Sequence, residues 1–136
     1  MRVESLRREG RGRLSRVFLL EDHSWFRKAL ADFLEQEADL QVVGEAGSIS
    51  EGRREAADKT GEIDLALIDL LLPDGIGTEL IGDLRRTNPG VPVLVLTAAK
   101  GPDLDTWVRS MGADEMISKD ASIDEILAAI RVLLRG

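Results

Sequence analysis

The chain has 136 residues, enough for one domain with a hydrophobic core and too few for two of ordinary size. It contains no Cys, which excludes disulfides, thiolate metal sites and cysteine nucleophiles. It also lacks a signal segment and any apolar run near the ~20 residues of a membrane helix, so the cytoplasm is the expected compartment and no membrane partner is expected.

The formal charge of −7 is unevenly distributed along the chain. Residues 1–16 carry six Arg against two Glu, which leaves 12 basic against 23 acidic residues in 17–136. The segment 1–15 is interpreted as a basic, disordered leader, with an arm that touches an anionic partner as the alternative. We interpret 16–136 as the folded domain. Its acidity argues against direct nucleic-acid binding, which requires Lys and Arg to neutralise phosphates.

Short apolar runs alternate with longer amphipathic stretches from Arg16 onward, a pattern typical of β/α units and a parallel sheet. The predicted strands are 16–20, 41–45, 65–69, 91–97 and 115–118. The predicted helices are 24–37, 48–59, 77–87, 102–111 and 122–136. Five such repeats predict an α/β fold with a flavodoxin-like, doubly wound five-stranded parallel sheet in the order 2-1-3-4-5 and helices on both faces.

Two further features of these elements can be read from the sequence, the helix caps and the run of leucines after the third strand. Ser24 is expected to cap the first helix, and Ser122 with Glu125 forms a capping box for the last. After the third strand, Leu70, Leu71 and Leu72 read either as an extension of that strand or as a loop over its end.

Polar side chains follow four of the five predicted strands. Glu21 and Asp22 follow the first, Asp69 ends the third, Thr97 ends the fourth, and Lys119 follows the fifth. Each alone could be a loop or surface residue, but carboxyl ends of parallel strands share one edge of the sheet, where ligands bind. Three carboxylates at one edge repel each other unless a cation lies among them.

The types of side chain at this edge indicate which cation and which anionic ligand it would bind. Carboxylate oxygens favour a hard ion such as Mg²⁺. His23 lies beside the acids, but Mg²⁺ seldom selects imidazole, so His23 is interpreted as a loop residue at the helix start. A hydroxyl and a lysine across from the ion favour a phosphoryl group, and an Asp carboxylate can accept it as an aspartyl phosphate.

These residues resemble the receiver domain of bacterial two-component response regulators over 16–135. The resemblance rests on an ordered set: the acidic pair, the acceptor Asp69, Pro73 four residues later, Gly77 eight later, then Thr97 and Lys119. The stretches EDHSWFRKAL, QVVGEA and GADEMISKDAS are most similar to receivers that precede a LuxR-type helix-turn-helix. That subfamily also shares Lys119-Asp120 where most receivers have Lys-Pro.

The resemblance implies a role for each residue. Asp22, Asp69 and the backbone carbonyl of Leu71 would ligate Mg²⁺, and Glu21 would act mostly through water. Thr97 and Lys119 would contact the phosphoryl group. The implied partners are a sensor histidine kinase or phosphotransfer protein, with a possible homodimer on phosphorylation. The implied function is a switch domain, not an enzyme, that controls a partner or an output domain in transcription regulation.

Two departures and two alternatives accompany this interpretation. Met116 stands where the family usually has the Tyr or Phe that switches together with Thr97, and no DNA-binding domain follows Gly136 in this sequence. A degenerate receiver that only docks other proteins is one alternative. The other is a haloacid-dehalogenase-type phosphatase, which needs a second Asp two residues past the nucleophile, where this chain has Leu71.

Overall fold

The computed structural model describes residues 14–136, so residues 1–13 of the leader predicted at 1–15 lie outside this range. In chain order the elements are β1 (Ser15–Leu20), α2 (Ser24–Glu35), β2 (Leu40–Ala46), α3 (Ile49–Asp58), β3 (Leu65–Asp69), β4 (Leu71–Leu72), β5 (Gly75–Ile76), the 3-10 helix η1 (Gly77–Leu80), α4 (Ile81–Thr87), β6 (Val93–Thr97), α5 (Leu104–Ser110), β7 (Glu115–Ser118) and α6 (Ile123–Arg135). No helix among these described residues is long and apolar enough to cross a membrane.

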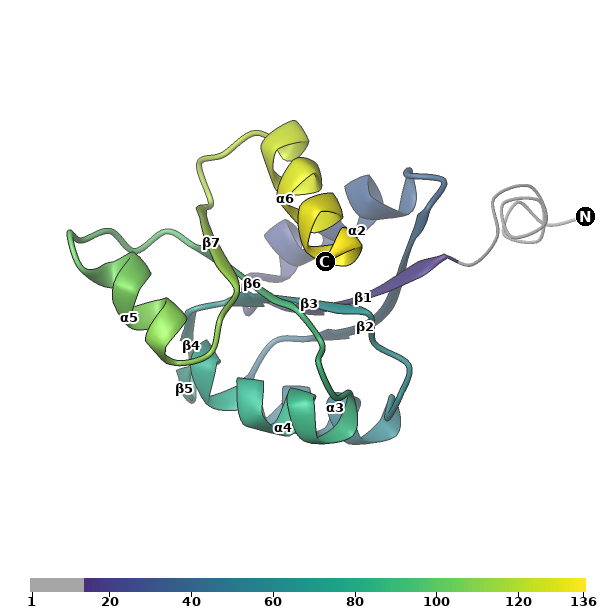
Figure 1. Cartoon of the computed structure of the whole chain (residues 1–136), viewed down its shortest axis with the longest axis horizontal. Helices are drawn as coiled ribbons and strands as arrows, with labels where there is room; N and C mark the ends of the chain where they lie inside the picture. The colour runs from purple at the N-terminus through teal and green to yellow at the C-terminus, as the bar shows by residue number, and fades with distance from the viewer. Residues whose placement is uncertain (1–13) are drawn as a thin grey trace, which may run out of the picture.

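The main sheet has five parallel strands in the order β2-β1-β3-β6-β7. This order confirms the predicted flavodoxin-like winding, since β6 and β7 are the fourth and fifth strands of that sheet. Figure 1 shows α2 and α6 on one face of the sheet, α3 and α4 on the other, and α5 beside the β7 edge. The reversal of winding lies between β1 and β3, where a doubly wound sheet opens a crevice for ligands.

Each face of the sheet has its own apolar core because successive strand residues point to opposite sides. In β1, Val17 and Leu19 pack with Leu34 of α2 and other residues of the α2 and α6 face. Phe18 and Leu20 pack toward the opposite face. Every residue of the central strand β3 is buried, and the strand therefore reads as a continuous apolar run up to Asp69.

Several element boundaries differ from those expected. His23, not Ser24, is the N-cap of α2, and its imidazole Nδ1 accepts a hydrogen bond of 3.3 Å from the backbone N–H of Phe26. The predicted helix at 77–87 begins as the 3-10 turn η1 and becomes α4 only at Ile81. The first strand begins at Ser15, and the buried Leu14 packs just before it.

The three leucines after Asp69 do not continue the strand of the main sheet. Leu70 is buried, and Leu71–Leu72 form β4, which pairs antiparallel with Gly75–Ile76 of β5. This hairpin turns over the end of β3, and the Leu71 side chain is 57% exposed. Leu71 and Ile76, which pair across the hairpin, are both exposed apolar residues of the segment that follows Asp69.

The hairpin is fixed at its turn and at its base. Asp74 accepts hydrogen bonds of 2.8 and 3.0 Å from the backbone N–H groups of Ile49 and Ser50 at the start of α3, and these bonds hold the pKa of its carboxyl below the usual range. After the hairpin, the N–H of Gly77 donates a 2.7 Å bond to the carbonyl of Leu70. A Cβ atom at Gly77 would lie 1.9 Å from the carbonyl oxygen of Asp69, so only glycine fits.

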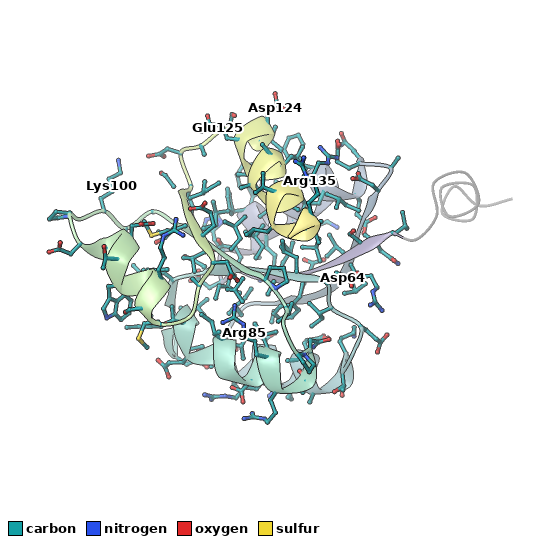
Figure 2. All side chains as sticks on the ribbon, in the orientation of Figure 1. Asp64, Arg85, Lys100, Asp124, Glu125 and Arg135 are labelled. Atoms are coloured by element: carbon teal, nitrogen blue, oxygen red, sulfur yellow. The ribbon has the colours of Figure 1, made fainter. Side chains whose placement is uncertain are left out.

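Arg85 forms a second set of stabilising hydrogen bonds at the opposite end of the sheet, where β6 and β7 begin. Arg85 points from α4 toward the sheet (Figure 2) and donates to the carbonyls of Val91 and Gly112 and to the carboxylate of Asp114. The same carboxylate accepts from the N–H of Val93 at 2.8 Å. These bonds fix where β6 and β7 begin, and thereby where Thr97 and Lys119 are delivered at their ends.

The close approach at Gly77 predicts a large effect of one added methyl group. Gly77→Ala should lower the free energy of unfolding by about 2–4 kcal/mol, because the backbone of β3 or of η1 must shift. Gly82→Ala is the matched control: a Cβ atom there meets nothing within 4 Å, so replacement within α4 should be neutral or stabilising. Urea denaturation of both variants measures this, and equal stability of the two would contradict the packing described for Gly77.

Candidate functional site

The carboxyl ends of four strands bring the predicted polar residues to one edge of the sheet. Glu21 and Asp22 follow β1, and Asp69 is the last residue of β3. Thr97 and Lys119 come from the neighbouring pair of strands. Thr97 ends β6 and pairs in register with Ser118 of β7, and Lys119 is the residue after Ser118. The backbone N–H of Lys119 also donates a 2.9 Å bond to the carbonyl of Thr97.

Lys119 is the centre of the site. Its ammonium Nζ lies 2.9 Å from Oδ2 of Asp69 and 2.6 Å from Oε1 of Glu21. Both carboxylates are nearly inaccessible to solvent, Glu21 at 4% and Asp69 at 5% exposure. Buried charges require partners, and a single ammonium here serves two of them.

The pKa values of this group reflect the balance between burial and pairing. Burial raises the pKa of Glu21 above its usual range, and the hydrogen bonds from Lys119 and from the N–H of His23 only partly offset this effect. Burial lowers the pKa of Lys119, but the hydrogen bonds to Glu21 and Asp69 outweigh it, and the net pKa is raised. Lys119 therefore stays protonated.

The acidic residues at this edge fit a divalent cation. Glu21, Asp22 and Asp69 each offer a carboxylate oxygen, and these oxygens lie within 4.8 Å of one another. Two of the three residues are buried and Asp22 is exposed, so the cluster opens toward solvent on one side. A hard ion with oxygen ligands matches this donor set, since one ammonium does not balance three carboxylates.

Of the expected switch residues, Thr97 ends β6, and Met116 lies on β7 three residues before Lys119. Thr97 is 1% exposed, and its hydroxyl accepts a 3.0 Å hydrogen bond from the N–H of Ala99. Met116 is half-buried and packs against the core on the α3 and α4 face. The hydroxyl of Thr97 is thus engaged by its own loop, while Lys119 contacts Asp69 directly.

Leu71 lies beside Asp69 through its backbone. Its N–H approaches Oδ1 of Asp69 at 3.4 Å, a long contact, and its side chain turns outward. The side chain offers no group that could act as acid or base next to Asp69. The carbonyl that was expected to ligate an ion belongs to β4, the short strand of the hairpin.

Two residues near the site were not predicted from the sequence. Arg27 donates a 2.6 Å bond to the carbonyl of Glu21 and pairs with Glu45 at 3.4 Å, which fixes the turn that carries both acids. The ring of Phe26 lies 5.1 Å from the ammonium of Lys119. Their spacing within α2 gives no signal for either contact, because both depend on how the helix packs on the sheet.

Comparisons with known proteins show the family to which this chain is similar. The profile of the response regulator receiver domain family matches residues 17–131. The chain is 35% identical over 116 residues to the DNA-binding transcriptional activator DevR/DosR of Mycobacterium tuberculosis, covering 85% of this chain and 52% of the activator. It is 39% identical over 122 residues to the KDP operon transcriptional regulatory protein KdpE of Escherichia coli, covering 90% and 52%.

A solved structure of similar fold is the LuxR-family two-component response regulator of Aurantimonas sp. SI85-9A1. The TM-score is 0.81 at 26% identity, with 90% of this chain and 86% of that chain covered. The chain spans about half the length of the curated relatives it matches.

The pairing at Lys119 predicts a pH-dependent loss of stability in Lys119→Met. Because folding raises the pKa of Glu21, its contribution to stability is full below the usual value of 4.5 and falls as the pH rises through the raised value. Without Lys119, which lowers that pKa, this fall becomes larger. The free energy of unfolding of the variant should fall by about 1–3 kcal/mol near neutral pH and by markedly less at pH ~5.

Lys100→Met is the control for this experiment, since Lys100 forms an exposed pair with Asp120 at 3.5 Å. Its stability should follow the wild type at both pH values. Denaturation curves at the two pH values decide the matter, and a loss in Lys119→Met that does not change with pH would refute the pairing argument.

Proposed function

Because the chain belongs to the receiver domain family of two-component response regulators, we propose that it works as a phosphoacceptor switch whose acceptor is Asp69. The observation that supports this most is the position of Lys119, 2.9 Å from Asp69 and 2.6 Å from Glu21, beside a cluster of three acids. The proposed donor is the phosphohistidine of a sensor histidine kinase or phosphotransfer protein.

The proposed reaction is a direct phosphoryl transfer. A carboxylate oxygen of Asp69 attacks the phosphorus of the donor, a P–O bond forms, and the P–N bond to the imidazole breaks. The imidazole nitrogen keeps the electron pair and takes up a proton. Lys119 neutralises negative charge that develops on the transferred oxygens.

We propose Mg²⁺ as the ion of this site. Asp22, Asp69 and the carbonyl of Leu71 would hold it directly, with Glu21 acting mostly through water. When bound, the ion supplies charge neutralisation at the phosphoryl oxygens. It would also relieve the repulsion among the three acids, which the single ammonium of Lys119 does not balance.

Phosphorylation would change the conformation through Thr97. A phosphoryl group on Asp69 offers acceptors stronger than any that the Thr97 hydroxyl contacts now, where it only accepts a bond from Ala99. Movement of Thr97 toward the phosphoryl group would free space near Met116. Methionine is flexible enough to repack into that gap, although it lacks the ring and hydroxyl of the usual residue.

The consequence would be altered contact with a partner, an output domain or a second copy of the chain. The curated relatives are transcriptional regulators about twice as long, so we propose transcription control as the output and assign DNA binding to other parts of such proteins. The cytoplasmic location and the non-enzymatic role remain predictions of the same kind.

The two alternatives have weaker support. A phosphatase of the haloacid dehalogenase type needs an acid two residues past the nucleophile, and Leu71 supplies none. A docking scaffold needs neither the acceptor nor the lysine, yet both are buried or half-buried and paired with each other. Met116 is the one residue that favours the scaffold.

The proposal predicts one phosphorylation site. With Mg²⁺ and acetyl phosphate, the wild type should gain one phosphoryl group that hydroxylamine removes, and Asp69→Asn should gain none. Asp83→Asn is the control, because it changes an acid of α4 that pairs with Arg53 on the surface. Intact-protein mass spectrometry measures the reaction, and hydroxylamine-labile labelling of Asp69→Asn would show that the acceptor is misassigned.

A further inference from the structure

The ammonium of Lys119 contacts more than carboxylates. It has three N–H groups, and Glu21 and Asp69 account for two of them. On α2, the ring of Phe26 has its centroid 5.1 Å from Nζ, within the range of a cation–π interaction. Phe26 therefore presents a neutral, aromatic face to the ammonium.

Phe26 and Lys119 also both line an apolar groove between α2 and α6. The groove has a volume of about 210 Å³, and its lining includes Phe26, Ala29, Phe33, Ile123 and Lys119. The Lys119 side chain is only 21% exposed. Lysine carries its ammonium on a flexible four-carbon stem, so the ring limits the directions in which this ammonium can leave the carboxylates.

We propose that Phe26 is a positioning residue for phosphoryl transfer, whose aromatic face holds the ammonium of Lys119 against Asp69. This inference rests on the proposed function, since it assigns a role in the reaction at that same acid. It concerns Phe26 alone and adds no ligand to the site.

The charge on the aromatic face and the volume of the side chain are separate contributions of Phe26. The π face carries partial negative charge, which attracts an ammonium, and this attraction becomes stronger as water is excluded. A leucine at position 26 fills most of the same space without that charge. Lys119 would then sample more conformations, and the transferred oxygens would meet a correctly placed cation less often.

The test compares Phe26→Leu, Phe26→Tyr and Phe33→Leu in the full chain. We expect Phe26→Leu to lower the initial rate of phosphorylation by acetyl phosphate about three- to tenfold. Phe26→Tyr keeps the aromatic face and should retain most of the rate. Phe33→Leu changes a ring of the same helix and groove and should react like the wild type.

Calorimetric Mg²⁺ affinity, measured on the same variants, distinguishes positioning from a general disturbance of α2. A loosened helix would also shift the Glu21–Asp22 turn, whereas loss of the ring contact should leave the affinity within about twofold of the wild type. The inference is overturned if Phe26→Leu reacts at the wild-type rate, if its Mg²⁺ affinity falls along with its rate, if Phe26→Tyr is equally slow, or if Phe33→Leu shows the same loss.

These outcomes are separate from failure of the proposed function. If the wild type is not labelled on Asp69 at all, the proposed function is wrong. If it is labelled and Phe26→Leu reacts as fast, only the role of Phe26 is refuted.

Discussion

Two carboxylates buried at the end of a parallel sheet are the central constraint of this molecule. Glu21 and Asp69 are almost fully removed from water, and the ammonium of Lys119 reaches both at hydrogen-bond distance. Burial of an unpaired carboxylate is strongly unfavourable, so the sheet must deliver this lysine to this edge. The remaining negative charge makes the same edge suitable for a cation and a phosphoryl group, and stability and proposed function therefore depend on one cluster.

The rest of the structure holds that cluster in place. The turn after β3 is fixed by Asp74 at the start of α3 and by the close approach of Gly77 to the carbonyl of Asp69. On the other side, Arg27 binds the carbonyl of Glu21, and the Phe26 ring faces Lys119. These contacts come from α2 on one face of the sheet and from η1 and the start of α3 on the other, so the geometry of the site depends on the packing of both helical layers.

Sequence patterns predicted the strand order and the acids at the edge, since a parallel sheet places the residue after each strand at a common rim. They could not predict the roles of Phe26 and Arg27, which depend on the rotation of α2 over the sheet. His23 and Ser24 are adjacent residues that can both cap a helix, and His23 is the N-cap of α2 in the structure. Periodicity also could not assign the three leucines after Asp69, because a hairpin of two-residue strands is too short to show a pattern.

The central claim is that a phosphoryl group on Asp69 is held by Lys119 and draws Thr97 away from its present partner. A crystal structure with Mg²⁺ and beryllofluoride, a tetrahedral mimic of a phosphoryl group, tests this most directly. The account predicts beryllium bonded to the Asp69 carboxylate, with Lys119 and the Thr97 hydroxyl on its fluorines. Beryllium on another acid, or a Thr97 hydroxyl still accepting from the N–H of Ala99, would contradict it.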